Sequence, residues 1–215
     1  MDGVTRDPVL TLVRSRLAAF SDWTAARPTA LVVAVLLAVS LLKSGFVVWN
    51  WFELSPNLLT SWDRPDSAFQ ANVLFNAFGS AWAGLGLDTT SFVWLLVQVA
   101  VTVGALVLIS ALVLRRTRHE SQYLALAAIL SSGIAAVMWR EIGRYDTFFL
   151  VGVAIAVLGI RAWVSWLGAA IAALTSPEQL LVAAVIFLLL ALVPAFAEWR
   201  AVAVRLLASA FAVLV

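Results

Sequence analysis

Residues 91–114 read SFVWLLVQVAVTVGALVLISALVL and contain no charged side chain. The hydrocarbon core of a bilayer requires about 20 consecutive apolar residues in a helix that crosses it. The stretch therefore predicts a membrane-spanning helix. Residues 115–120, RRTRHE, follow it directly, and such arginine-rich segments are typical of the cytoplasmic end of a span.

The composition of the whole chain agrees with a membrane protein. Of the 215 residues, 63% are hydrophobic and 12% are charged, and the mean hydropathy is +1.01. A soluble domain carries about 25% charged residues. Although the isoelectric point is high, the net charge is only +2, so we expect no nucleic-acid partner. We expect the chain to be surrounded by membrane lipid. The absence of cysteine excludes disulfides, thiolate metal sites and cysteine nucleophiles.

Six further apolar runs lie on either side of residues 91–114, and we number all seven in chain order. The fold class that we predict is all-α, a polytopic transmembrane helical bundle with six to seven spans, with residues 29–215 as the transmembrane domain. The expected additional runs are 29–51, 121–138, 147–160, 162–174, 180–197 and 201–215.

Residues 1–28 are predicted to form a cytoplasmic amphipathic segment. Within 8–26, one apolar stripe repeats about once per helical turn, and Arg14 and Arg16 fall outside it. The alternative is a frayed basic tail. The stripe consists of Leu10, Val13, Leu17 and Phe20.

The arginines predict the orientation, because positive charge gathers in cytoplasmic loops. With a cytoplasmic N-terminus and alternating spans, only Arg64, Arg140 and Arg144 are external. The ten cytoplasmic arginines are then Arg6, Arg14, Arg16, Arg27, Arg115, Arg116, Arg118, Arg161, Arg200 and Arg205.

Seven carboxylates are external in this orientation, although acidic residues do little to set topology. The first external loop, 52–90, is long, and its apolar second half, 68–87, predicts one or two interfacial helices. The runs 147–160 and 162–174 are shorter than a span requires, so we expect their external ends to lie below the membrane surface. The external carboxylates are Glu53, Asp63, Asp66, Asp88, Glu141, Asp146 and Glu178.

Asp63 and Asp66 lie in SWDRPD, residues 61–66, with Pro65 between them. A carboxylate at the outer interface can act as a general base toward an acceptor hydroxyl. It can also bind a divalent cation, for which carboxylate oxygens are suitable ligands. A turn followed by a helix cap at Asp66 explains the same residues without any chemistry.

Arg140 and Arg144 lie in WREIGRYD, residues 139–146, and share one face if this turn is helical. Two guanidinium groups beside an apolar cavity suit the phosphate of a lipid-linked donor. Asp146 either pairs with an arginine or contacts a sugar hydroxyl. The alternative is a turn whose two positive and two negative charges neutralise each other.

Glu178 lies in TSPEQ, residues 175–179, which predicts a helix start with Ser176 as N-cap and Pro177 at the first helical position. Capping alone explains this segment. The functional alternative is that Glu178 faces the same cavity as Asp146.

The layout resembles the N-terminal half of the GT-C class of polyprenyl-phosphate-dependent glycosyltransferases. The resemblance is carried by the long first external loop, by GRYD at 143–146 and by SPEQ at 176–179. Two features depart from that family. The adjacent acidic pair often found in its first loop is absent, and its members usually have eight or more spans, whereas this chain stops within its seventh.

The resemblance implies transfer of a sugar from a polyprenyl-phosphate donor at the outer face of a bacterial plasma (inner) membrane. Asp63 or Asp66 is then the catalytic base. Arg140 and Arg144 hold the donor phosphate, and Asp146 and Glu178 orient the donor or a metal. The chain is then a truncated member, a fragment of one, or a divergent member without full activity. The alternative function is non-enzymatic, as a small transporter or a scaffold subunit of an envelope complex.

Overall fold

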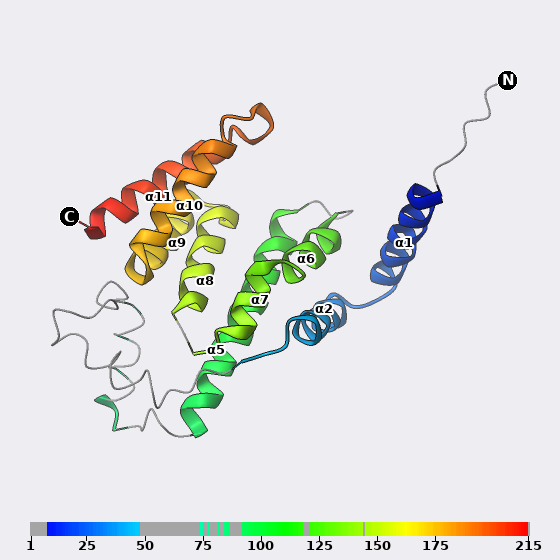
Figure 1. Cartoon of the computed structure of the whole chain (residues 1–215), viewed down its shortest axis with the longest axis horizontal. Coiled ribbons are helices and arrows are strands. Elements are labelled where there is room, and N and C mark those ends of the chain that lie inside the picture. Colours follow the sequence, from blue (N-terminus) through cyan, green and yellow to red (C-terminus); the bar gives the residue numbers. More distant parts are fainter. Residues whose placement is uncertain are drawn as a thin grey trace.

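A computed structural model of the chain describes residues 8–47, 92–117, 121–143 and 145–214, together with residues 74, 77, 81 and 84–86. Within these residues the structure is all-α, with nine α-helices, one short 3-10 helix and no strand longer than the single bridge residue Ile142 (Figure 1). The elements are α1 (Pro8–Ala25), α2 (Thr29–Ser44), α5 (Phe92–Arg116), α6 (Gln122–Leu130), α7 (Gly133–Arg140), α8 (Asp146–Leu158), α9 (Ala162–Thr175), α10 (Pro177–Leu190), η2 (Pro194–Phe196) and α11 (Trp199–Leu214).

Each expected apolar run coincides with a helix, but three of the expected boundaries were wrong. The first run ends at Ser44 instead of residue 51, because Gly45 has a φ of 65° and turns the chain out of the helix. The sixth run ends at Leu190, a few residues before Pro194, which starts the 3-10 helix. The third run is interrupted and forms two helices.

The interruption of the third run lies at Ser131 and Ser132, between α6 and α7, which meet at a bend of 49°. The hydroxyl of Ser132 accepts a 3.2 Å hydrogen bond from the backbone N–H of Ile134 and caps α7. It also donates a 2.6 Å bond to the carbonyl of Ile129. Serine competes for backbone groups in this way, which explains why the helix breaks at this point of an otherwise apolar run.

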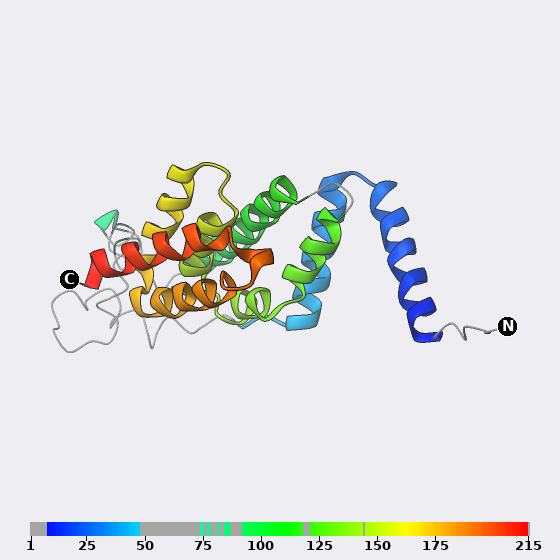
Figure 2. The same ribbon diagram turned by 90° about the horizontal axis from the view of Figure 1, so that it is seen from above.

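Two cores hold the helices together. The first core joins α5, α6 and α7, with α2 and α8 packed against it. The second core joins α8, α9, α10 and α11, which lie beside one another (Figures 1 and 2). The buried residues of the first core are Ala105, Leu106, Ile109, Val113, Leu126, Leu130, Ala135, Met138, Trp139 and Ile142. Those of the second are Phe149, Ala156, Ala169, Ala172, Ala173, Leu180, Ala184, Leu206 and Ala210.

The second core is built mainly of alanine, and many large apolar side chains of the described helices are exposed instead. Trp163 on α9 and Leu189 on α10 are exposed, and on α5 the exposed fraction of Phe92 reaches 70%. Small residues between helices allow close backbone approach, which is characteristic of helix packing in membranes. A protein folded in water instead buries its large apolar side chains.

By length and composition, α5 is the one described helix that can cross a membrane alone, and α6 with α7 passes the same test as a bent pair. About a third of the apolar window of α5, 33%, is buried within the structure. The helices α2, α8, α9 and α10 are apolar but shorter. With 13 residues, α8 extends about 20 Å.

The predicted interfacial helices of the first external loop are only partly within the described residues. Residues 74, 77, 81 and 84 are helical, and Gly86 turns the chain with a φ of 74°. This agrees with a helix in the second half of the loop.

Candidate functional site

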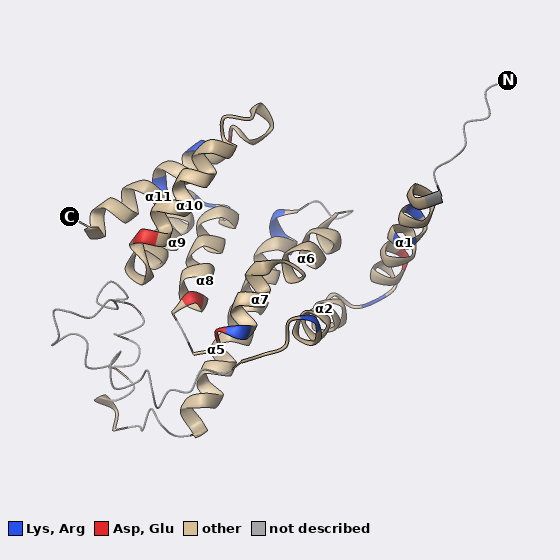
Figure 3. Cartoon of the chain, in the orientation of Figure 1, with Lys and Arg blue, Asp and Glu red and all other residues tan. Residues whose placement is uncertain are grey.

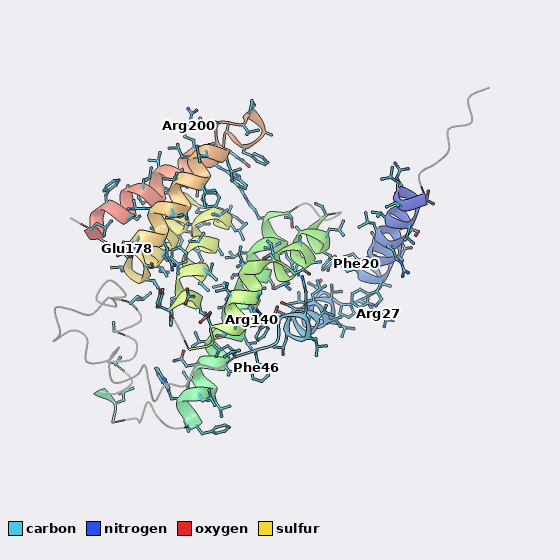
Figure 4. The ribbon with its side chains drawn as sticks, viewed as in Figure 1. Phe20, Arg27, Phe46, Arg140, Glu178 and Arg200 are labelled. Atoms are coloured by element: carbon cyan, nitrogen blue, oxygen red, sulfur yellow. The ribbon has the colours of Figure 1, made fainter. Side chains whose placement is uncertain are left out.

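Many of the charged side chains of the described helices lie near helix ends (Figure 3). Acidic residues lie where α8 and α10 begin, namely Asp146 and Glu178. Basic residues lie at the opposite ends, where α5 finishes with Arg115 and Arg116 and where α11 begins near Arg200. We call the first the acidic end and the second the basic end. Figure 4 shows Glu178 and Arg200 at opposite ends of the α10–α11 pair.

Asp146 and Glu178 belong to one packed unit. Phe149, one turn beyond Asp146, and Leu180, in the turn of Glu178, are both buried in the second core. The structure therefore brings the two predicted carboxylates to the same end of the same helical group. Asp146 is half-buried and Glu178 is exposed. A carboxylate in the first turn of a helix is also favoured by the helix dipole, so each has a structural role as well.

The start of α10 follows the sequence prediction. Ser176 occupies the N-cap position and Pro177 is the first helical residue. The Ser176 side chain makes no capping hydrogen bond, although the residue is buried. The helix start is thus encoded by Pro177 and Glu178 rather than by the serine hydroxyl.

A close contact between α8 and α9 holds the beginning of α8 in place. A Cβ atom added to Gly152 would lie 2.6 Å from the backbone nitrogen of Ala172, and one added to Gly168 would lie 2.6 Å from the carbonyl oxygen of Gly152. Both distances are too short for any side chain. Such close backbone approach at glycines is typical of packing between membrane helices.

Arg140 has a role that the sequence did not reveal. Its Nε donates a 2.9 Å hydrogen bond to the carbonyl of Ser44, the last residue of α2. A cation at a helix C-terminus satisfies a carbonyl that has no partner within the helix. The segment after Arg140 is not helical, since Glu141 is the C-cap of α7 and Gly143 has a φ of 91°. The condition under which Arg140 and Arg144 would share a helical face is therefore not met.

Further contacts near Arg140 join α2 to α6 and α7. Lys43 Nζ donates a 2.7 Å hydrogen bond to the carbonyl of Ser131, at the break between the two helices. The N–H of Val47 donates a 3.1 Å bond to the carbonyl of Trp139. The chain thus leaves α2 beside the end of α7, and Figure 4 shows Phe46 close to Arg140 there. The end of α7 therefore lies beside Ser44 and Val47.

Two buried polar side chains, Gln98 on α5 and Thr147 on α8, were not among the predicted site residues. Each is 2% exposed, and neither the Nε2 of Gln98 nor the Oγ1 of Thr147 has a hydrogen-bond partner among the described residues. An unsatisfied buried polar atom costs about 1–3 kcal/mol. Thr147 follows Asp146 directly, so its hydroxyl belongs to the acidic end. The sequence contained one signal for Thr147, because it is a polar residue that directly follows the candidate carboxylate Asp146 at the start of an apolar run.

Asp63, Asp66 and Arg144 lie outside the described residues. The described part of the chain contains no group of three or more histidine, cysteine or carboxylate residues placed to hold a metal ion. The residues that can be placed at the acidic end are therefore Arg140, Asp146, Thr147 and Glu178.

Comparison of this chain with protein-family models, with curated proteins and with solved structures found no match.

Proposed function

We propose that this chain is a membrane glycosyltransferase, or part of one, that transfers a sugar from a polyprenyl-phosphate donor at the acidic end of its helices. The observation that carries this proposal is the placement of Asp146 and Glu178 at one end of one helical group, opposite the end rich in arginine. Arginine marks the cytoplasmic side, so the acidic end faces outward, where a lipid-linked donor and an acceptor would meet.

The proposal includes a polytopic arrangement of six to seven spans in a bacterial inner membrane. It is supported by the outward-facing large apolar side chains on α5, α9 and α10 and by the small residues between α8 and α9. Short helices such as α8 cross only if the bilayer thins or if their ends lie below the surface. The second case would draw Asp146 and Thr147 toward the apolar layer, where lipid-linked sugars are held.

The reaction we propose is a single displacement at the anomeric carbon. The acceptor hydroxyl oxygen forms the new bond to this carbon, while the bond from the carbon to the phosphate oxygen breaks. The electron pair leaves with the polyprenyl phosphate, and the hydroxyl proton passes to Asp63 or Asp66 as general base. Asp146 and Glu178 orient the donor directly or through a divalent cation.

The donor phosphate requires positive charge, which Arg140 and Arg144 supply in this proposal. The bond from Arg140 to the Ser44 carbonyl holds its guanidinium at the C-terminal end of α2. Arg144 is the better residue to mutate, because changing Arg140 also removes a bond to α2.

The test is saturable binding of a radiolabelled polyprenyl monophosphate to the protein in nanodiscs. Arg144→Gln is expected to weaken binding about tenfold or more, as for a lost charge-assisted hydrogen bond. The matched control is Arg200→Gln at the basic end, which should bind as the wild type does. Absence of saturable binding by the wild type, or equal effects of both variants, would contradict the proposal.

A scaffold subunit is the second candidate, and one observation favours it. Three of the residues at the acidic end have a structural role, since Asp146 and Glu178 begin helices and Arg140 ends one. A scaffold needs no donor. If the chain is a scaffold, Asp146→Asn and Glu178→Gln should change only the stability of the protein. If it is a transferase, the same variants should lose sugar transfer while remaining folded.

A further inference from the structure

Helix α1 lies apart from the rest of the described chain. Figures 1 and 2 both show it standing beside the other helices, to which it is joined through residues 26–28. Most of its residues are exposed, including its largest aliphatic ones, with exposed fractions of 57% for Leu10 and 45% for Leu17. Its apolar face therefore finds no core within the described part of the protein.

The side chains of α1 form a narrow apolar stripe with a cation on either side. At about 100° per residue, Leu10, Val13, Leu17 and Phe20 gather on one face. Arg14 lies about 80° to one side of the middle of this stripe, and Arg16 lies about 80° to the other. Long arginine side chains in such flanking positions can extend their guanidinium groups toward phosphate while their methylene stems cover apolar surface.

Helix α1 joins the other helices at their basic end. The hydroxyls of Thr29, at the start of α2, and Tyr123, at the start of α6, are 2.9 Å apart and hydrogen-bonded. The helix before Tyr123 is α5, which ends with Arg115 and Arg116. Arg27 lies in the connection between α1 and α2. The C-terminal end of α1 is thus joined to the other helices at the end of the structure where Arg115 and Arg116 lie.

We propose that α1 docks onto the anionic phospholipid surface of the leaflet at the basic end. Its stripe would lie at the boundary between headgroups and acyl chains, with Arg14 and Arg16 on lipid phosphates. Charge complementarity selects this occupant. A negatively charged leaflet attracts basic segments next to a membrane helix by about 1 kcal/mol per Lys or Arg. This binding is independent of the proposed transferase activity.

Because the sequence contains no cysteine, a single introduced cysteine can be labelled specifically to test this proposal. A single cysteine in place of Leu17, within the stripe, is labelled with an environment-sensitive fluorophore. The matched control is Ser15→Cys, on the opposite and exposed face of the same helix, where only a bond to the Leu12 carbonyl is lost. The full chain is placed in nanodiscs of phosphatidylcholine alone or with one-third phosphatidylglycerol.

With phosphatidylglycerol present, we expect the Leu17→Cys label to shift to the blue and to become shielded from iodide, while the Ser15→Cys label stays accessible. Adding Arg14→Gln and Arg16→Gln should lower the docked-to-free ratio of α1 by about 30-fold, the equivalent of two lost cations at about 1 kcal/mol each. The variant with Arg14→Lys and Arg16→Lys should retain docking, because attraction to an anionic lipid surface depends on charge rather than on the geometry of the guanidinium group.

Three results would overturn the proposal. Equal shielding of the Leu17→Cys label in both lipid compositions would show that anionic lipid is not the partner. Shielding of the label that survives the Arg14→Gln and Arg16→Gln changes would show that charge does not hold α1 at its partner. Accessibility of the label under every condition would show that α1 stays in solvent. None of these readouts depends on donor binding, so failure here is distinguishable from failure of the proposed function.

Discussion

The indole Nε1 of Trp139 on α7 donates a 3.1 Å hydrogen bond to the hydroxyl of Ser40 on α2, and both residues are buried. The Ser40 hydroxyl in turn donates a 2.6 Å bond to the carbonyl of Leu130 at the end of α6. One serine thereby joins three helices around the break in the third apolar run. This contact also holds the C-terminal end of α7 against α2.

Replacing Ser40 should loosen this junction. Ser40→Ala leaves the buried indole N–H of Trp139 without its partner, and we expect the free energy of unfolding in mixed micelles to fall by about 1–3 kcal/mol. Ser15→Ala, which removes an exposed bond within α1, serves as the control and should change it by less than about 0.5 kcal/mol. Equal values for the two variants would show that the junction contributes nothing to stability.

The glycines divide into those that touch backbone and those that do not. Gly168→Ala should destabilise the protein by about 1–3 kcal/mol, because the new Cβ would overlap the backbone of α8. Gly104→Ala on α5 meets nothing within 4 Å and should be neutral or slightly stabilising. Thermal unfolding of both variants in the same detergent measures the difference. A stable Gly168→Ala protein would mean that α8 and α9 are further apart than the structure shows.

Thr147 separates stability from function. Thr147→Val removes a buried hydroxyl that has no hydrogen-bond partner in the described part of the chain, while keeping the shape of the side chain. Stability should rise by up to about 1–2 kcal/mol, because a desolvated polar atom is lost. If the hydroxyl contacts the donor, polyprenyl phosphate binding should weaken in the same variant. Serine at this position restores the hydroxyl and is the control for binding. A Val variant that is less stable would show that the hydroxyl is satisfied in the folded protein.

A second polar chain links α11 to α8 through α9. Arg205 Nη1 donates a 2.9 Å bond to the hydroxyl of Ser165, which donates a 2.6 Å bond to the carbonyl of Ala156. A double-mutant cycle with Arg205→Met and Ser165→Ala should give a coupling energy of about 0.5–2 kcal/mol. Unfolding in mixed micelles supplies the four free energies. A coupling energy of zero would show that Arg205 acts only through its charge at the basic end.

Much of the fold could be predicted from the sequence because each helix carries its own local signal. The seven apolar runs coincide with α2, α5, the α6–α7 pair, α8, α9, α10 and α11. Pro177 with Glu178 predicted where α10 begins. The candidate site was predictable in part. The alternation of spans already placed Asp146 and Glu178 on one side, whereas the hydrogen bond from Arg140 to the Ser44 carbonyl and the burial of Thr147 depend on packing between helices.

The sequence by itself determined the helical class, the approximate helix positions and the bias of arginine toward one side, since these depend on composition and on neighbours within a few residues. Only the tertiary structure decided the bond from Arg140 to Ser44 and the contacts that hold α2 against the α6–α7 pair. Those features depend on contacts between α2 and the α6–α7 pair, whose partners are separated by 88 to 99 positions in the chain. A glycine in an apolar run looks the same whether its neighbour is backbone, as for Gly168, or open space, as for Gly104, until the second helix is in place.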